Sequence, residues 1–327
     1  MMISRKPEVV VIGGGTGLPV ILRGLKKYPI NITAIVTVAD DGGSSGRLRE
    51  ELHIPPPGDI RNVMAALSNV EPLFEEVFQH RFQTSNELSG HSLGNLMIAA
   101  LASITGNFAQ AIQEMCKVLN VSGKVLPAAD QSVVLHAEMT DGSIITGESN
   151  ISQSRSKIKQ VFLTPDTIKP LPETVKAIRN ADMIVLSPGS LYTSILPNLL
   201  VPELGEEVCK ARAKKVLISN IMTQPGETDH FTASDHLQVI YDHMECSFIH
   251  TAIVNSQQIP RDIQRRYLKK GAKPVVFDKD RLRSMRVNIV NDEIIKYDKK
   301  LIRHDTDKVA KILYNILINE AKKIVKI

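Results

Sequence analysis

Short apolar runs alternate with glycine-rich polar segments near the start of the chain. The run 9–12 stops at Gly13, and the run 32–38 stops before Asp40. A third glycine-containing segment, 55–62, leads into apolar positions with helical spacing. This order of apolar run, glycine-rich turn and helix is typical of parallel strands in an α/β sheet. Ligands of such sheets bind at the carboxyl ends of the strands, where glycine lets backbone N–H groups approach an anion.

The same alternation continues to the end of the chain, with one interruption. Residues 125–165 predict a small β element instead, because two alternating runs flank Asp141-Gly142, as in a β-hairpin. We expect 149–156 to be a polar loop. We also expect Asp59 to cap a helix over 60–69, and a helix to begin at His91. The prediction is one Rossmann-like nucleotide-binding domain over 1–327, an α/β fold whose mostly parallel sheet has helices on both faces.

Composition places the chain among globular proteins, with 43% apolar and 23% charged residues. No apolar run approaches the roughly 18 residues of a membrane span. The segment before the first predicted strand is too short and polar for a signal peptide, so we expect a cytoplasmic protein. Cysteines 116, 209 and 246 lack metal-ligand spacing, and we expect buried thiols.

The positive charge is concentrated near the end of the chain. Residues 265–327 hold 18 Lys and Arg against 8 Asp and Glu, whereas residues 1–264 hold 22 against 27. These basic residues are dispersed among acids, and aromatic side chains for stacking on bases are few. We therefore expect a solvated basic face that helps to attract a polyanionic small ligand, and no nucleic-acid partner.

The first glycine loop departs from the dinucleotide-binding fingerprint. Counting from Gly13, the sixth position is Leu18 where that pattern needs glycine. The lone acid expected after the second strand is replaced by the pair Asp40 and Asp41. Either carboxylate could hold Mg²⁺ bridging phosphates or accept a sugar hydroxyl, although Asp-Gly is also ordinary turn chemistry. Binding of NAD is disfavoured but stays open.

Two further groups of polar residues admit a structural and a functional interpretation. His91 and Asn95 stand one helical turn apart, so they could present two polar tips to a ligand or belong to the core. Ser187 to Ser190 follow an apolar run as the first glycine loop does, which indicates a fourth anion-binding loop. No serine, histidine and aspartate stand in a recognisable catalytic context.

Together these segments resemble the YvcK-type gluconeogenesis factors. The resemblance is carried by the motifs at 13–17, 39–49, 56–62, 90–96, 187–194, 220–228 and 302–305. The wider CofD-like superfamily includes 2-phospho-L-lactate transferase, which attaches phospholactate to a deazaflavin precursor using a guanylylated donor and Mg²⁺. The resemblance implies a crevice that takes UDP-sugars, notably UDP-N-acetylglucosamine, and a role in cell shape and cell-wall precursor balance on gluconeogenic carbon sources.

Carried onto this chain, the resemblance and the loops give one set of candidate residues, with Asp40 and Asp41 also as the Mg²⁺ pair. The nucleotide- and sugar-binding candidates are Gly13, Gly14, Gly15, Thr16, Gly17, Asp40, Asp41, Gly43, Ser44, Ser45, Arg47, Gly58, Asp59, Asn62, His91, Asn95, Gly189, Ser190, Thr193, Asn220 and Arg303.

The resulting hypothesis is a regulatory protein that binds a nucleotide sugar without turnover. It is expected to form a homo-oligomer and to act on a protein target in amino-sugar or cell-wall precursor synthesis. A phospholactate-type transferase with a nucleotide-linked donor and Mg²⁺ is the first alternative, because a superfamily of transferases keeps an enzyme in view. An NAD-binding oxidoreductase is the second.

Overall fold

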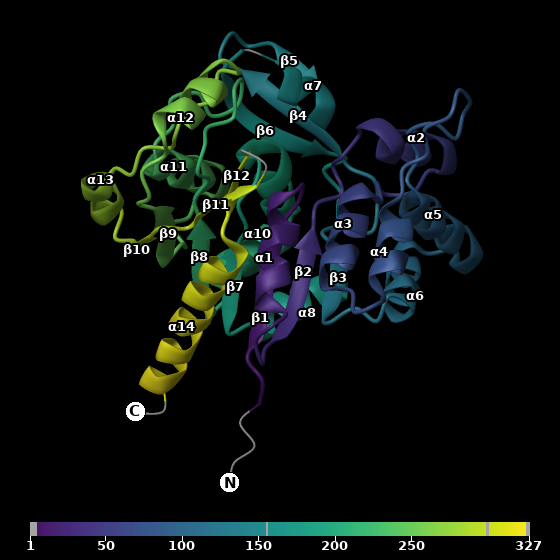
Figure 1. Ribbon diagram of the computed structural model, residues 1–327, viewed down its shortest axis with the longest axis horizontal. Coiled ribbons are helices and arrows are strands. Elements are labelled where there is room, and N and C mark those ends of the chain that lie inside the picture. Colours follow the sequence, from purple (N-terminus) through teal and green to yellow (C-terminus); the bar gives the residue numbers. More distant parts are fainter. Residues whose placement is uncertain (1–4, 155, 299–300, 325–327) are drawn as a thin grey trace.

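A seven-stranded parallel sheet forms the centre of the protein (Figure 1). The computed structural model describes residues 5–154, 156–298 and 301–324. The strands of this sheet are β1 (Glu8–Gly13), β2 (Asn31–Val36), β3 (Lys124–Pro127), β7 (Met183–Leu186), β8 (Lys214–Ile218), β9 (Thr251–Asn255) and β10 (Asn288–Asp292). Their order is β10-β9-β8-β7-β1-β2-β3, and every neighbouring pair is parallel. The predicted α/β fold with a Rossmann-like sheet is confirmed.

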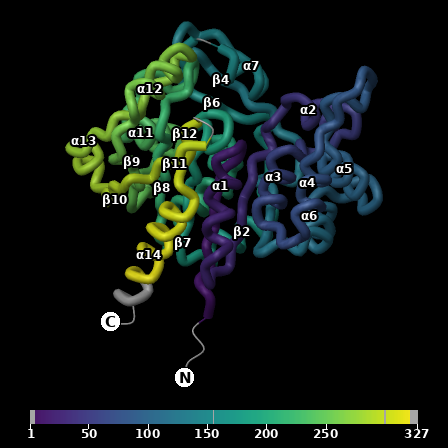
Figure 2. Tube along the Cα trace, viewed as in Figure 1, coloured from purple at the N-terminus to yellow at the C-terminus, as the bar shows by residue number. Residues whose placement is uncertain are grey.

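Helices cover both faces of the sheet and bury its apolar strands. They are α1 (Gly17–Leu25), α2 (Gly43–Leu52), α3 (Gly58–Leu67), α4 (Pro72–Gln79), α5 (Leu93–Thr105), α6 (Phe108–Val118), α8 (Pro172–Asn180), α9 (Leu196–Leu199), α10 (Leu204–Lys210), α11 (Ala233–Met244), α13 (Lys279–Ser284) and α14 (Thr306–Ile324), with a π-helical turn, η1, over Leu191–Ile195. Helix α14 packs along α1, so the end of the chain returns to its beginning (Figures 1 and 2). This packing encloses fully buried side chains of β1 such as Val11 and Ile12.

The inserted β element forms a separate antiparallel sheet. It consists of β4 (Val134–Met139), β5 (Ile144–Thr146) and β6 (Ile158–Thr164), with helix α7 (Glu148–Gln153) between β5 and β6. The predicted hairpin around Asp141-Gly142 is present, but two details of the prediction are wrong. Residues 124–127 belong to the central sheet, since β3 pairs with β2. The supposed polar loop at 149–156 mostly lies in α7, which Gly147 precedes with a positive φ of 95°.

A second addition comes from the end of the chain. Helix α12 (Arg261–Leu268) and the hairpin of β11 (Ile295–Asp298) and β12 (Leu301–His304) pack on a small apolar cluster of their own. The cluster contains Ile221, Ile259, Ile295 and Ile302. The hydroxyl of Tyr267 accepts a hydrogen bond of 2.8 Å from the backbone N–H of Ile302, which ties α12 to the hairpin.

The secondary structure predicted from local sequence was wrong for three segments. The segment 40–47, expected as a loop, becomes helical from Gly43. Asp59 is not a cap: it lies inside the first turn of α3, and its carboxylate accepts from the N–H of Gly15 instead. His91 precedes its helix, since Ser92 is the N-cap of α5 and accepts from the N–H of Asn95. For Asp59 and His91 a contact with another segment replaced the local role: Asp59 bonds to Gly15, and the His91 ring contacts the Ser44 hydroxyl.

The cysteines differ from the expectation of three buried thiols. Cys209 and Cys246 form a disulfide, with Cα atoms 6.8 Å apart and a sequence separation of 37 residues. This separation gave no metal-ligand or redox pattern from which the pairing could be predicted. Cys116 is free, and burial raises the pKa of its thiol to about 12, so it is unreactive near neutral pH.

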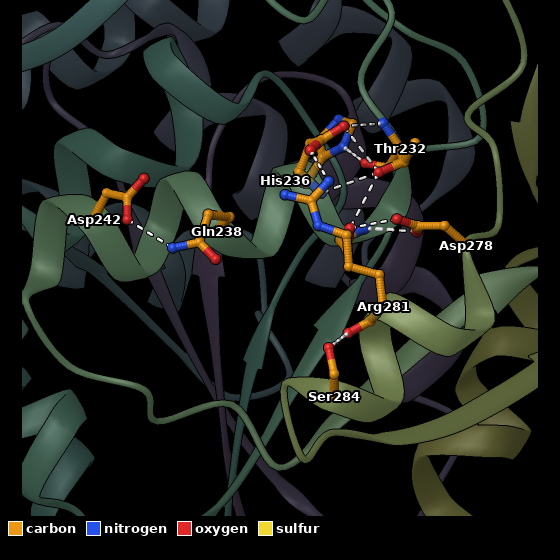
Figure 3. A network of polar contacts seen from close by, with 9 residues as sticks. Thr232, His236, Gln238, Asp242, Asp278, Arg281 and Ser284 are labelled. Atoms are coloured by element: carbon orange, nitrogen blue, oxygen red, sulfur yellow. Dashed lines mark hydrogen bonds and ion pairs between the residues drawn. The ribbon is translucent and has the colours of Figure 1, made fainter.

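Polar contacts at the start of α11 fasten the β9–β10 side of the sheet (Figure 3). Thr232 and Asp235 form a reciprocal capping box. Asp278 accepts from the N–H and hydroxyl of Ser234, and Arg281 of α13 pairs with Asp235 at 2.5 Å. These contacts join α11 to α13. Among the helices that the structure describes, none has the length and apolarity needed to cross a bilayer.

Candidate functional site

A cavity of about 430 Å³ with both polar and apolar lining residues opens at the carboxyl ends of the central strands. It lies between the loops that follow β1 and β7, which are neighbours in the sheet. The chain proceeds from β1 to β2 and β3 on one side, and from β7 to β8 and β9 on the other. The sheet therefore has its topological switch point there, the position where open α/β sheets bind ligands. The volume falls within the ~300–1,000 Å³ of small-molecule sites.

Glycines allow the first and fourth loops to touch at this point. A Cβ on Gly17 would overlap the carbonyl oxygen of Pro188 and lie 2.7 Å from its carbonyl carbon. Gly15 has a positive φ of 59°, and a Cβ there would meet only the Ser194 hydroxyl, at 3.4 Å. Gly17 is thus required by packing, whereas Gly15 is required by backbone conformation and lines the open cavity.

Asp59 holds the first glycine loop in place through a hydrogen bond to its backbone. Its Oδ2 accepts a hydrogen bond of 2.6 Å from the N–H of Gly15, so this amide is already occupied. Burial raises the pKa of the Asp59 carboxyl to about 6, and nearby Asp40 adds to the increase, while the bond from Gly15 opposes it. Asp59 therefore holds the loop in place instead of facing the cavity.

Two carboxylates lie in the wall of the cavity. Glu148 and Ser152 of α7 line it together with Glu227 and Thr193. Burial raises the pKa of Glu148 to about 7; the Thr193 hydrogen bond opposes this, and the neighbouring carboxylates add to it. Glu227 is only 6% exposed and accepts from the hydroxyls of Ser152 and Ser190; burial raises its pKa as well. Glu148 also accepts from the Ser152 hydroxyl, at 3.4 Å, so this serine contacts both carboxylates and Glu227 has the further contact from Ser190.

The C-terminal hairpin supplies a cation to the same cavity. Arg303 is exposed on β12 and lines the cavity with Tyr267 and His304. The ring of His304 contacts the carbonyl of Ser219 at 3.1 Å, and burial lowers the pKa of this histidine to about 4. His304 is therefore neutral at physiological pH. Asn220, which donates to the carbonyl of Gly189 at 2.7 Å, fixes the fourth loop on the opposite wall.

Asp40 and Asp41 lie near Glu148, and each accepts a hydrogen bond from a backbone N–H group. Asp40 accepts from the N–H of Gly42 at 2.9 Å, and Asp41 accepts from the N–H of Ser149 at 2.9 Å. Asp41 thereby anchors the start of α7. In the described residues, no three His, Cys, Asp or Glu side chains are grouped closely enough to hold a metal ion. The pair fits an ion shared with ligand phosphates, because Mg²⁺ is usually held by one or two carboxylates plus phosphate and water.

Comparisons with known proteins identify the family of this chain. Residues 9–295 match the family described as 2-phospho-L-lactate transferase CofD. The chain belongs to the CofD family. A Bacillus subtilis (strain 168) protein named gluconeogenesis factor is 62% identical over 96% of this chain and 99% of its own. A gluconeogenesis factor of Halalkalibacterium halodurans is 56% identical over 94% of this chain and 96% of its own.

A solved structure shares the fold of this CofD-family chain. A Bacillus halodurans protein, determined by X-ray crystallography, superposes with a TM-score of 0.93 at 56% identity and covers 95% of this chain and 100% of that one. The resemblance to gluconeogenesis factors and to the CofD-like superfamily that the motifs predicted is confirmed.

The candidate residues of this CofD-family chain fall into two groups. The cavity is lined by Gly15, Thr16, Gly17, Gly189, Ser190, Thr193, Asn220 and Arg303. The others do not line it: Gly13, Gly14, Asp40, Asp41, Gly43, Ser44, Ser45, Arg47, Gly58, Asp59, Asn62, His91 and Asn95. Their role in binding stays a prediction.

Several of the residues outside the lining hold the scaffold together. The Ser44 hydroxyl contacts His91 Nδ1 and accepts from the Asn95 amide, both at 3.0 Å, and all three residues are buried. This contact fastens α2 to α5. Arg47 donates to the backbone carbonyls of Glu87 and Ser89, and Asn62 accepts from Arg61.

Sequence reasoning missed three prominent lining residues of the CofD-family site. Glu227 lies in the motif 220–228 and follows β8 as the other loops follow their strands, so its position was a usable signal. Glu148 gave none, because it sits in the insertion, directly before the predicted polar loop at 149–156. Tyr267 gave none either, since only the docking of α12 on the β11–β12 hairpin brings it to the cavity.

Proposed function

We propose that this protein binds a nucleotide sugar of the UDP-N-acetylglucosamine type and acts as a regulator of growth and cell shape on gluconeogenic carbon sources. The observation that supports binding is the cavity at the switch point, where two glycine-containing loops meet opposite Arg303. The gluconeogenic role is supported by the names of the relatives with 62% and 56% identity. The regulatory output would pass through a protein target in amino-sugar or cell-wall precursor synthesis, and a homo-oligomer is part of the proposal.

The cavity suits a diphosphate joined to uncharged groups. The amino terminus of α1 adds partial positive charge beside Gly15 and Thr16. Arg303 can hold two phosphate oxygens at once with its planar guanidinium. Asp40 and Asp41 would hold Mg²⁺ if the ligand brings one, and the ion would neutralise phosphate charge near these carboxylates.

A transferase is the second candidate function, and two observations favour it. The family match is to a transferase. The Glu148 carboxyl, whose pKa burial raises to about 7, titrates in the range suited to a general base. We favour binding without turnover because the contacts of Asp41 and Glu227 are explained by holding α7 and the fourth loop.

Calorimetric titration with UDP-N-acetylglucosamine tests the binding proposal, with GDP and NAD as competitors and with or without Mg²⁺. We expect saturable binding at about micromolar affinity or better, which corresponds to about −8 kcal/mol. Absence of binding, with NAD bound well, would refute it in favour of an oxidoreductase. Incubation with Mg²⁺ and acceptor alcohols should leave the nucleotide intact by mass spectrometry. Turnover lost in Asp40→Asn would establish the transferase.

A further inference from the structure

The cavity wall carries groups of both charges. Arg303 and the amino terminus of α1 line it together with Glu148 and Glu227. Asp40 and Asp41 are close enough to Glu148 to oppose its ionisation. A ligand of this cavity must therefore place its negative charge against Arg303 and the helix terminus, and present uncharged hydrogen-bond donors to the carboxylates.

Glu148 is fixed in place by the inserted sheet. Asp41 accepts from the N–H of Ser149, and a Cβ on Gly147 would collide with the Asp41 carboxylate. The start of α7 is thus held against the segment between β2 and α2, with Glu148 in the cavity wall. Glu227 accepts from Ser152 and Ser190, so it serves to position α7 and the fourth loop. Glu148 accepts from the Ser152 hydroxyl at 3.4 Å and from Thr193, and a carboxylate with about four acceptor sites keeps capacity for a ligand.

We infer that Glu148 selects the sugar of the bound nucleotide, accepting hydrogen bonds from hydroxyl or amide groups of an uncharged sugar and repelling a sugar that bears a carboxylate. This inference rests on the proposed binding of a nucleotide sugar. A charged acceptor forms stronger hydrogen bonds than a neutral one. A second carboxylate beside Glu148 would meet Glu148 and Glu227 of the cavity wall, with Asp40 and Asp41 adding to the negative charge nearby. Like charges brought together at a binding surface carry a large penalty.

The experiment measures Kd by calorimetry for UDP, UDP-glucose and UDP-glucuronate, which differ only in the sugar and its carboxylate. Assays run at pH 8.5, above the pKa of Glu148, so that this group is charged. We expect the native protein to bind UDP-glucose at least about tenfold more tightly than UDP-glucuronate. In Glu148→Gln this ratio should fall by about fivefold or more, mainly because UDP-glucuronate binds more tightly. The affinity for UDP should stay within about twofold, since UDP lacks the second sugar that Glu148 is inferred to contact.

Two further variants make the result decisive. Glu148→Asp keeps the charge on a shorter side chain, so it should retain the rejection of UDP-glucuronate while it loses affinity for UDP-glucose. Glu50→Gln, on an exposed position of α2, should behave as the native protein. An unchanged ratio in Glu148→Gln with normal UDP binding would overturn this inference alone. Failure of the native protein to bind any of the three nucleotides would overturn the proposed function, and this inference with it.

Discussion

Substitution of Gly17 by alanine should destabilise the whole protein, because it separates the two loops that form the site. The added Cβ would lie 2.7 Å from the carbonyl carbon of Pro188 and closer still to its oxygen. Ordinary carbon contacts are ~3.5–4.0 Å, so the backbone of one loop must retreat by about 1 Å. No side-chain rotation can relieve the overlap, since the obstructing atoms are backbone.

The expected cost is about 2–4 kcal/mol, at or above the usual range for inserting a methyl group into a packed region. Gly15→Ala is the matched comparison, two residues away in the same loop. Its Cβ would meet only the Ser194 hydroxyl, at 3.4 Å, but the residue must keep a φ of 59°. Holding alanine in this left-handed conformation costs about 1–2 kcal/mol.

Urea unfolding and nucleotide binding of the two variants distinguish packing from recognition. Gly17→Ala should lower the urea midpoint of unfolding more than Gly15→Ala does. It should also weaken nucleotide binding, because both loops move. Gly15→Ala should unfold nearer the native midpoint yet lose affinity, because its methyl group enters the cavity that Gly15 lines. Equal stability of Gly17→Ala and the native protein would refute the close approach of the loops at Pro188.

Three other measurements test the charges and the covalent link. Folding raises the pKa of Asp59 from 3.8 to about 6, so the folded state keeps this proton to higher pH, and stability is lost as pH rises from about 4 to about 6. Asp59→Asn should remove this pH-dependent loss of stability. At pH 8 the variant should be more stable than the native protein by about 1–2 kcal/mol, a value reduced for the partial exposure of Asp59. Stability curves of the two proteins that run parallel against pH would contradict this. Arg303→Ala should weaken UDP-sugar binding by about 1.5–3 kcal/mol without changing the melting temperature, and unchanged affinity in calorimetry would place Arg303 outside the site. Reductant should lower the free energy of unfolding of the native protein by about 2–4 kcal/mol, because it breaks the Cys209–Cys246 disulfide. The stability of Cys209→Ser should not change with reductant. An equal effect of reductant on both proteins would argue against the disulfide.

The central sheet could be predicted because its signals are local. Fully buried parallel strands such as β1 and β7 appear in the sequence as continuous apolar runs, and a glycine- or serine-containing turn marks each carboxyl end. Strand β3 was missed as a member of the sheet, because its four residues carry no such turn and only pairing with β2 defines it. Helix α7 was missed for a similar reason: its polar sequence resembles a loop until Asp41 fixes its start.

The site was predicted as far as it follows strand ends. Gly15 and Ser190 follow β1 and β7, and the adjacency of these strands brings both to one cavity. Arg303 came instead from the resemblance to a family. Glu148 could be predicted neither from the strand ends nor from the resemblance, because its position depends on a tertiary contact across more than 100 residues of sequence. Local rules describe turns and strand ends, whereas contacts between separate additions to the sheet are decided by packing.

This division suggests where affinity and selectivity reside. Loops after β1 and β7 offer amides and a helix terminus, which bind any phosphate and ignore what is attached to it. Glu148 comes from α7, between strands of the inserted sheet, and Arg303 comes from the C-terminal hairpin; both elements lie outside the central sheet. Substitutions in the loops should therefore weaken all nucleotides alike. If Glu148 selects the sugar as inferred above, substitutions there should instead alter the ratio between nucleotides, because this carboxylate would meet the sugar and the loops would meet the phosphates.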